Sequence, residues 1–503
     1  MLNRKTASIA TILAAASVGV IASASADSSA DAPRFASGGT LTEVLATTPR
    51  GPILGYARSI LIPSLGGREP IGSANQPARL HPDLRGRIMR LNEGPEAGQS
   101  DHPIFPSSWW PMVDNGIAFR YNSNVRNFND WTTDRDNLSP AEKYDLLIYP
   151  GQTQRLAEVR NYTPEEASAP ANERGEPHVA PATNVVGPTT SWELSNHGVY
   201  QRNYPESWWG HCNGWSASVT AEREGAPLRD IRVRRGGRGE ILECGAGENG
   251  CILFRTADIE ALLSEVYFND ASTVSGRRCN TEPAEIERDA YGRPTDPVCR
   301  DLNPATMHVA LTGLLGEGVT PLSAPNAGPE RMPFVVDYAY HNEVWTFPVV
   351  QYRIDQIEPI DEARAIDLVC KGTSGANCDD YPFNENARRF ARVKTRFWVV
   401  GYATTGRDLL TPPLSRERNL LETSLNYVLE MDGRNVIIGG EWIESPTTNT
   451  PDNKELHPDF LFMSVYPNAS DEGPDDRGGS SDNPYLSYND VKALLRISRT
   501  SAR

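Results

Sequence analysis

Seven cysteines constrain this 503-residue chain more than any other feature of its sequence. Six of them form three close pairs, and each pair encloses a loop that contains Gly, Asn or Pro. This spacing is typical of local disulfides in an oxidising compartment. The most economical pairing, with other pairings open, joins Cys244 to Cys251, Cys279 to Cys299, and Cys370 to Cys378. The seventh, Cys212, is left over, and it predicts an intermolecular bridge, an inert buried thiol or a functional nucleophile.

The first residues have the three parts of a secretory signal peptide. Arg4 and Lys5 give a positive start, an apolar run of small and aliphatic residues follows, and Ala24-Ser25-Ala26 is an A-x-A cleavage site. The sequence therefore predicts a signal peptide at residues 1–26 and a secreted or periplasmic protein. Because no later run approaches the ~20 apolar residues of a spanning helix, we expect no membrane association after cleavage.

The formal net charge of −16 argues against nucleic acid as a partner. Binding to phosphates needs clustered Lys and Arg. The only compact basic run, residues 232–238, is interpreted as a turn with solvated charges. The sequence does not indicate an oligomeric state.

Helical patterns come first in the central region and extended patterns follow. Helices are predicted at 212–224, 256–268 and 304–315, and strands at 334–338, 343–354, 392–404, 427–431 and 436–442. A further short amphipathic helix is predicted near residue 490. This order predicts an α+β domain, with helices packed on an antiparallel sheet.

Cys212 lies at the predicted start of a helix, within the segment Gly210-His-Cys-Asn-Gly-Trp215. A helix N-terminus stabilises a thiolate, and it can lower a cysteine pKa from ~8.5 into the ~3.5–7.5 range. Its free amides can also hold the oxyanion of a tetrahedral intermediate. We therefore predict that Cys212 is a nucleophile, with Gly210, His211, Asn213 and Trp215 positioning the substrate or the oxyanion. Gly210 and the nearby glycine at 214 would let a substrate backbone approach.

A thiol nucleophile needs a base, and two histidines are candidates. His308 lies on a predicted helix, and His341 lies at the start of a predicted strand. The residues alone do not rank them. Asp337 is the favoured carboxylate to orient the base, because an acid between apolar strand residues needs a partner. Glu343 and Glu441 are the alternatives.

The sequence predicts no metal site and no cofactor. The paired cysteines have no companion histidine at zinc spacing, and the acidic tail lacks the ligand pattern of a calcium-binding loop. Calcium dependence stays open.

At these residues the chain resembles the transglutaminase elicitor family, which comprises exported transglutaminases of oomycete cell walls and bacterial relatives. The matching segments are Trp208-Trp-Gly-His-Cys-Asn-Gly-Trp215, Asn303-Pro-Ala-Thr-Met-His-Val-Ala-Leu311, Glu343-Val-Trp-Thr-Phe-Pro-Val349, and Ile438-Gly-Gly-Glu-Trp442 with His457-Pro-Asp-Phe460. They cover most of residues 205–462. Where the family pattern has Trp-Asn-x-Pro, this chain has Trp345-Thr-Phe-Pro348, so a role for an Asn there does not carry over.

The resemblance implies a papain-like fold and acyl transfer from a protein glutamine to a primary amine such as lysine, through a thioester on Cys212. It carries His308 over as a motif member, without a defined role. The implied substrates are protein or peptide glutamines and amines. Two alternatives stand beside it: a papain-like cysteine peptidase or amidase, and an inactive secreted surface-binding protein.

The chain is predicted to have five parts. A leader or pro-segment at 27–100 follows the signal peptide, and an N-terminal extension occupies 101–185. The catalytic transglutaminase-like domain spans 186–465. A flexible acidic tail with a short C-terminal helix completes the chain at 466–503.

Overall fold

The computed structural model describes the greater part of the chain after residue 72. The described ranges are 73–84, 94–122, 135–152, 185–201, 205–268, 271–337, 344–370, 381–402, 420–443, 457–464 and 483–500, with gaps at 280, 282–283, 290, 292, 323 and 325, together with 58–59, 91, 154–155, 378 and 408–410. The predicted signal peptide lies outside the described residues.

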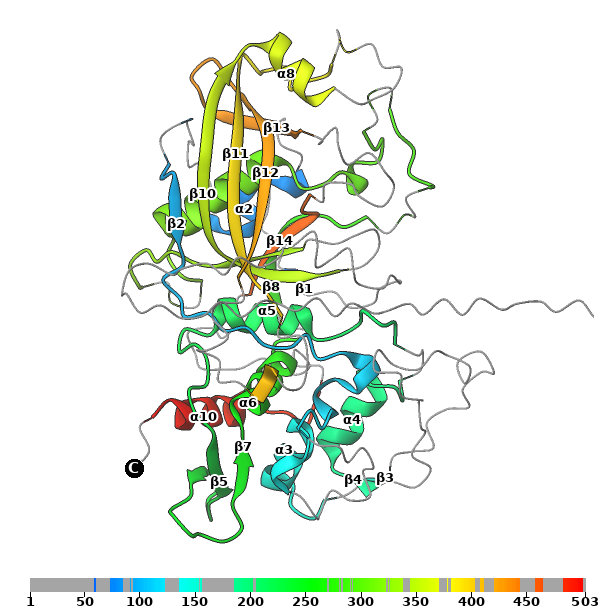
Figure 1. Ribbon diagram of the computed structural model, residues 1–503, viewed down its shortest axis with the longest axis vertical. Helices are drawn as coiled ribbons and strands as arrows, with labels where there is room; N and C mark the ends of the chain where they lie inside the picture. The colour runs from blue at the N-terminus through cyan, green and yellow to red at the C-terminus, as the bar shows by residue number, and fades with distance from the viewer. Residues whose placement is uncertain are drawn as a thin grey trace, which may run out of the picture.

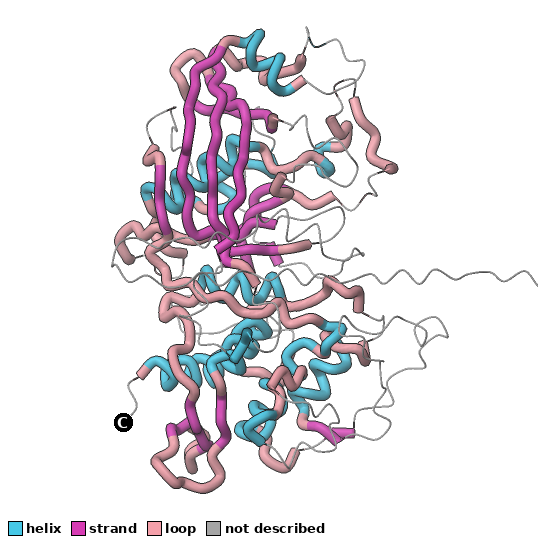
Figure 2. Tube along the Cα trace, in the orientation of Figure 1, coloured by secondary structure: helices cyan, strands magenta, loops and turns pink. Residues whose placement is uncertain are grey.

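The described strands gather mainly in one large sheet, in the upper part of Figures 1 and 2. Its order is β1-β8-β14-β9-β10-β11-β12-β13, and β2 pairs with β10. All pairings are antiparallel except that of β1 with β8. The strands are β1 (Arg58–Ser59), β2 (Ala97–Gln99), β8 (Ala271–Gly276), β9 (Phe334–Asp337), β10 (Thr346–Ile360), β11 (Arg389–Val400), β12 (Leu420–Met431), β13 (Ile437–Trp442) and β14 (Phe460–Ser464).

Most of the described helices lie below this sheet (Figure 1). They are α3 (Pro140–Ile148), α4 (Pro188–Asn196), α5 (Cys212–Ala221), α6 (Thr256–Val266) and α10 (Tyr488–Arg499). The short sheet β6-β5-β7 and the pair β3-β4 belong to the same part, with β3 (Gln154–Arg155), β4 (Val185–Val186), β5 (Ile231–Arg235), β6 (Ile241–Glu243) and β7 (Ile252–Phe254). Helix α5 lies between the two parts, because it packs on α6 on one side and on β10 and β14 on the other (Figure 1).

The large sheet carries its own helices. Helix α7 (Pro304–Ala310) packs on β12 and β13, and it continues into a π-helical segment, η9 (Leu311–Glu317). The others are α2 (Pro77–Leu80) and α8 (Glu362–Val369). Short 3-10 turns complete the described elements: η1 (Ser73–Asn75), η2 (Pro82–Leu84), η3 (Met112–Asp114), η4 (Gly116–Ala118), η6 (Arg135–Asn137), η8 (Pro297–Cys299) and η11 (Asp408–Leu410).

The predicted mixture of helices and antiparallel strands is confirmed, and so are the starts of the predicted helices. Helix α5 begins at Cys212, α6 at Thr256 and α7 at Pro304. Asn303 accepts a hydrogen bond from the first turn of α7, and Pro304 occupies the next position, as a cap and a first-turn proline should. The predicted end at Leu315 is wrong for an α-helix, since the last turns take π geometry.

Each predicted strand is present, with shifted limits. Strand β12 starts at Leu420 rather than at residue 427, and β10 runs on to Ile360. Strand β10 begins with five buried residues in a row, and β12 ends with five, so long stretches of both strands are buried on both faces.

The disulfide prediction is confirmed in full. Cys244 is bonded to Cys251, Cys279 to Cys299, and Cys370 to Cys378. Cys212 is a free, buried thiol.

Both ends of the described chain pack on the fold. Leu80 of α2 is fully buried, and β2 hydrogen-bonds to β10, so parts of the predicted leader lie against the sheet. Ser487 caps α10, whose Leu494 and Leu495 are fully buried beside α6. The limits of the five predicted parts stay predictions.

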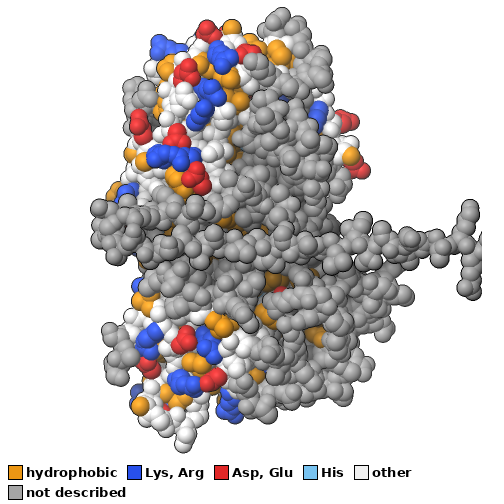
Figure 3. All heavy atoms as spheres, viewed as in Figure 1, with side chains coloured by type: hydrophobic (Ala, Val, Ile, Leu, Met, Phe, Trp, Pro, Cys, Tyr) orange, Lys and Arg blue, Asp and Glu red, His pale blue; other side chains and the backbone are white. Residues whose placement is uncertain are grey.

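On the face drawn in Figure 3, acidic and basic side chains of the described residues are interspersed rather than gathered by sign. Within the described residues, no helix combines the length and the apolar character needed to cross a membrane.

Helix α5 approaches α6 closely at Gly214. A Cβ at this position would collide with the carbonyl oxygen of Ser264 and meet Phe268, which are parts of the opposing backbone. We therefore expect Gly214→Ala to separate the two helices and to lower the free energy of unfolding by about 1–3 kcal/mol. Urea unfolding would measure this, with Gly237→Ala as control, since a Cβ there meets nothing within 4 Å. Equal midpoints for the two variants would contradict the tight contact.

Candidate active site

Cys212 is the first residue of α5, and its side chain is only 6% exposed. The turn before it is fixed, because the His211 backbone N–H donates to the carbonyl of Trp109 at 2.5 Å. The His211 side chain makes no cap hydrogen bond to the described helix start. The thiol therefore lies among the first-turn amides of α5, where the helix dipole favours negative charge.

The thiol faces the start of β10. Its sulfur lies 3.8 Å from the carbonyl oxygen of Val344. Ser216, one turn along α5, donates to the carbonyl of Thr346 at 2.9 Å, and the Tyr402 hydroxyl donates to the same oxygen at 2.7 Å. These bonds hold α5 and the start of β10 in fixed register, so that the thiol meets the strand residues that follow segment 338–343.

The described surroundings raise the pKa of the Cys212 thiol. Burial is the largest cause, a hydrogen bond with Thr346 opposes it, and the nearby Asp337 carboxylate adds to the increase. The lowered thiol pKa predicted from the helix N-terminus is therefore wrong for these surroundings. Removal of water outweighs the helix dipole, and a thiolate here needs a cationic partner.

Asp337 ends β9 and is fully buried. Its Oδ1 accepts a hydrogen bond from the Trp345 N–H at 3.0 Å, and its Oδ2 makes none with the described residues. Burial raises the pKa of Asp337 to about 8, although Arg278 and the Trp345 N–H oppose this. Burial and the Asp337 charge together raise the pKa of the neighbouring Asp459. Asp337 thus has one oxygen available for a further donor, close to the thiol.

The structure does not bring His308 to the thiol. His308 is buried on α7, and its Nδ1 lies 2.9 Å from the hydroxyl of Tyr427 on β12. Burial lowers the pKa of His308 to about 4, so the ring is neutral near pH 7. No described contact joins His308 to Cys212.

His341 and Glu343 lie outside the described residues, in the segment that links Asp337 to Val344. Glu441, the other alternative carboxylate, accepts a hydrogen bond from Tyr381 at 3.2 Å and has Arg293 nearby. These partners belong to the region of α8 and its disulfide rather than to the surroundings of Cys212.

The other predicted site residues have packing contacts. Gly210 is needed because a Cβ there would collide with the carbonyl of Trp109, and Gly214 is needed for contact with α6 rather than for a substrate. Asn213 donates to the carbonyl of Phe268 at 2.6 Å. Trp215 is fully buried, where its indole N–H donates to the carbonyl of Phe105 at 3.2 Å.

The His211 side chain points away from the thiol. It is fully buried and lies 3.2 Å from Glu193 and 3.2 Å from Glu265. Contact with a substrate does not fit this position.

Three aromatic residues of the site were not predicted from the sequence. Tyr402 lies beside the thiol, and burial together with Cys212 raises its pKa well above the usual value. The rings of Trp109 and Trp345 meet at 5.1 Å, and Trp345 also packs on Tyr402. Trp110, next to Trp109, has a positive φ of 46°, which is rare for a bulky residue and typical of strained functional segments. The adjacent tryptophans at 109 and 110 are typical of buried residues, but nothing in the sequence links them to Cys212.

The chain matches known proteins in two comparisons. The family model of the transglutaminase elicitors matches residues 239–501, which is more than half of the chain and begins after Cys212. The crystal structure of the GP42 transglutaminase from Phytophthora sojae is similar with a TM-score of 0.51 and 19% sequence identity, over 85% of this chain and 98% of that chain. At this identity the likeness concerns the fold. Comparison with curated proteins gave no match. Since the family match covers more than half of its residues, the chain belongs to the transglutaminase elicitor family.

Proposed function

We propose that this protein is an exported acyltransferase that links protein glutamine side chains to primary amines, such as lysine, through a thioester on Cys212. The observation that carries the proposal is the free thiol at the start of α5, which faces the start of β10 and has the Asp337 carboxylate of β9 nearby. Membership of the family and the fold shared with a transglutaminase support it.

In the proposed reaction the Cys212 thiolate attacks the carbonyl carbon of a glutamine side chain. A C–S bond forms, the C–N bond breaks, and the leaving nitrogen takes a proton and departs as ammonia. A primary amine then attacks the thioester, loses a proton to the base and releases the thiol. The first-turn amides of α5 are the proposed donors to the oxyanion.

His341 is the proposed base and Asp337 the carboxylate that orients it. Segment 338–343 is anchored at one end by Asp337, and at the other by Val344, whose carbonyl lies 3.8 Å from the thiol. His341 belongs to this six-residue segment, which makes it the candidate base nearest in sequence to both anchors. An imidazolium there would lower the pKa values of Cys212 and Asp337, opposing the increase that burial causes. The proposed arrangement is the papain-like one of a cysteine helix and a histidine on the sheet.

A cysteine peptidase or amidase is the alternative, because water could resolve the same thioester. The rings of Trp109, Trp345 and Tyr402 favour transfer to an amine, since an apolar wall disfavours water near the thioester. The buried thiol with its raised pKa favours the second alternative, an inactive secreted surface-binding protein. Three disulfides support export, and the proposed partners are protein or peptide glutamine and amine substrates.

The test is ammonia release from a glutamine-containing peptide, with and without a primary amine, for the wild type and Cys212→Ala. We expect amine incorporation in the wild type and none in the variant, because the variant has no acyl acceptor. Peptide cleavage or deamidation without incorporation would support the hydrolase. No turnover in the wild type would contradict the proposed enzyme.

A second test identifies the base through the rate of Cys212 alkylation by iodoacetamide as a function of pH. If His341 pairs with the thiol, the wild-type midpoint should lie below the usual thiol value of about 8.5. In His341→Ala the midpoint should move above it, because burial and Asp337 then act without opposition. A midpoint that moves in His308→Gln instead would assign the role to His308, and His102→Gln, a buried histidine paired with Glu330, is the matched control.

A further inference from the structure

Four buried side chains meet where α4, α5 and α6 come together, and one of them, His211, directly precedes Cys212 in the sequence. Glu193 lies on α4, and His197 follows one turn later at its C-cap. His211 is the N-cap of α5, and Glu265 lies on α6. Their exposed fractions are 0%, 5%, 0% and 0%. Three helices that are separate in the sequence therefore place two carboxylates and two imidazoles in one closed space.

The spacing of these groups fits the first shell of a small cation. One ligand atom from each residue lies within 4.8 Å of the others. His197 Nδ1 is 3.1 Å from Glu265 Oε2 and 3.6 Å from Glu193 Oε2, and His211 Nδ1 is 3.2 Å from Glu265 Oε2. Tetrahedral bonds of ~2.0–2.1 Å separate neighbouring ligands by about 3.4 Å. The three nitrogen–oxygen distances, from 3.1 to 3.6 Å, lie on both sides of this ligand separation.

Hydrogen bonding alone does not account for the cluster. Both ring nitrogens of His211 lie close to carboxylate oxygens, yet neither makes a hydrogen bond of acceptable geometry with a described residue. Glu193 Oε2 and Glu265 Oε1 make none either. Buried polar atoms are nearly always bonded, and two buried carboxylates need compensating charge. A network of protonated histidines would supply the charge, but it needs aligned N–H groups, which His211 lacks.

The surroundings orient the four side chains and exclude water. Glu193 Oε1 accepts a hydrogen bond from the Ile117 N–H at 3.0 Å, which leaves Oε2 for the centre. Gly116, with a φ of 53°, allows this approach, since a Cβ there would collide with Glu193 and lie 2.9 Å from His211 Nε2. Phe268 packs on both imidazole rings. A fixed outer shell and four protein ligands are typical of structural rather than catalytic metal sites.

We propose that Glu193, His197, His211 and Glu265 form a tetrahedral site for a divalent transition-metal ion of the zinc type. Two imidazole nitrogens favour such a metal over calcium, which takes six to eight oxygen ligands. Two carboxylates, two neutral imidazoles and a divalent ion also sum to zero charge, which suits a closed interior. The ion would tie α4, α5 and α6 together.

The site has a consequence for the thiol, which rests on the proposed function. His211 directly precedes Cys212, so a metal bound to His211 would fix the start of α5 and with it the thiol. In this role His211 is a positioning residue. Metal binding itself does not depend on the activity, so the two ideas fail separately.

The experiment measures metal binding by the full-length protein, irrespective of turnover. Chelator-treated wild type is titrated with Zn²⁺, Mn²⁺ and Co²⁺, and we expect one tightly bound Zn²⁺ per chain and the strong visible absorption of tetrahedral Co²⁺. Glu265→Gln and His197→Gln should weaken Zn²⁺ binding by at least about 10-fold. His102→Gln, which alters a buried histidine paired with Glu330 outside the cluster, should bind Zn²⁺ like the wild type.

Two results would overturn the proposal, and the first needs only the wild type. A folded wild type that binds none of the three ions stoichiometrically would leave the cluster a network of protonated histidines and carboxylates. Binding that is equal in wild type and both cluster variants would place the metal elsewhere. If a cluster variant does not fold, the Co²⁺ spectrum of the wild type still distinguishes a tetrahedral nitrogen and oxygen site from octahedral surface binding.

Discussion

Replacing Asp337 by asparagine should lower kcat for amine incorporation by about 10²- to 10⁴-fold without unfolding the protein. Asparagine is nearly the same shape, and its Oδ1 can keep the hydrogen bond from the Trp345 N–H. What it loses is the ionisable carboxyl group. Burial raises its pKa to about 8, and pairing with a protonated His341 would lower that value and leave a carboxylate to orient and stabilise the histidine cation. Steady-state kinetics with a glutamine peptide and an amine would measure the effect.

Stability distinguishes this role from a structural one. The folded-state pKa of Asp337, about 8, lies above its ordinary value of 3.8. Its contribution to stability is therefore complete below about pH 4 and is lost as the pH rises through about 8. Asparagine cannot ionise, so at pH 9 the variant should resist urea at least as well as the wild type. A loss of activity with a parallel loss of stability would contradict the assignment.

Glu430→Gln is the matched control for Asp337→Asn. Glu430 is also buried, and burial raises its pKa to about 7. It accepts a hydrogen bond from the Asn384 N–H on the far part of the sheet. The substitution should leave kcat within about twofold of the wild type, because Glu430 bonds to Asn384 and not to a residue around Cys212, so it adds nothing to transition-state binding.

Local signals in the sequence were enough for helix starts and disulfides. The Asn303-Pro304 pair sets the start of α7, and the cysteines of two pairs lie only 7 and 8 residues apart in the sequence. The end of α7 was not predictable in the same way. Its last turns take π geometry beneath the sheet, where β2 and β10 pack on η9, and those contacts come from distant parts of the chain.

The predicted start of β12 was seven residues too late, although the sequence contains the pattern of an earlier start. Residues 420–427 alternate between apolar and polar types, with Leu421 and Leu425 on the buried face and Ser424 exposed. This period of two is the mark of a half-buried strand, and it extends β12 beyond the predicted start.

The candidate site was predictable only as far as single residues. The segment around Cys212 pointed to a nucleophile, but the thiol pKa depends on burial and on Asp337, which arrives from another element. The cluster of Glu193, His197, His211 and Glu265 was hidden for the same reason. Glu193 and His197 are one turn apart, whereas Glu265 reaches them only because α6 packs on α5.

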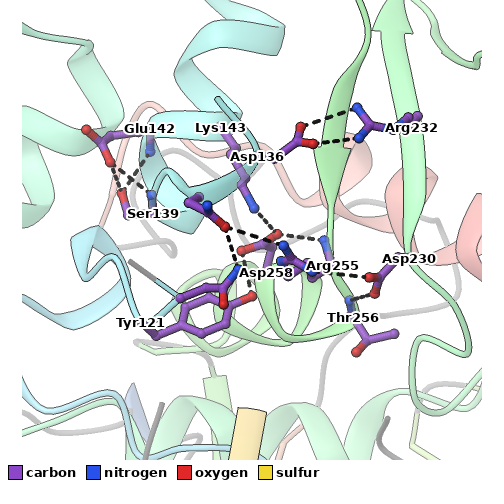
Figure 4. A network of polar contacts seen from close by, with 12 residues as sticks. Tyr121, Asp136, Ser139, Glu142, Lys143, Asp230, Arg232, Arg255, Thr256 and Asp258 are labelled. Atoms are coloured by element: carbon purple, nitrogen blue, oxygen red, sulfur yellow. Dashed lines mark hydrogen bonds and ion pairs between the residues drawn. The ribbon is translucent and has the colours of Figure 1, made fainter. Parts of the chain in front are cut away.

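The largest stability effect is expected from Lys143→Met in the helical part. Lys143 lies on α3 and is 1% exposed, and its Nζ lies 2.6 Å from Asp258 Oδ2 at the start of α6 (Figure 4). Tyr121 donates to the other oxygen of Asp258 at 3.0 Å. Methionine fills the space of the lysine stem but removes its charge. The free energy of unfolding should fall by about 3–5 kcal/mol, because an uncompensated carboxylate stays buried.

The loss should depend on pH. Burial raises the pKa of Asp258 even with Lys143 in place, and removal of the cation would raise it further. A raised folded-state pKa means that stability is retained at low pH and lost as the pH rises through that value. The deficit of Lys143→Met in urea unfolding should therefore be smaller at pH 5 than at pH 8. A deficit that is independent of pH would point to packing rather than charge.

Two further variants isolate the buried charge. Lys143→Met with Asp258→Asn should recover most of the lost stability, since no buried charge remains. The single asparagine oxygen can accept from the Arg255 N–H while its amide group donates to the Tyr121 hydroxyl, which take the places of the two carboxylate contacts. Arg232→Met breaks an ion pair of the same 2.6 Å length, with Asp136, but both partners are exposed (Figure 4). It should cost less than about 1 kcal/mol, because water screens the exposed pair and solvates the remaining carboxylate. Similar losses for Lys143→Met and Arg232→Met would mean that burial does not set the strength of these contacts.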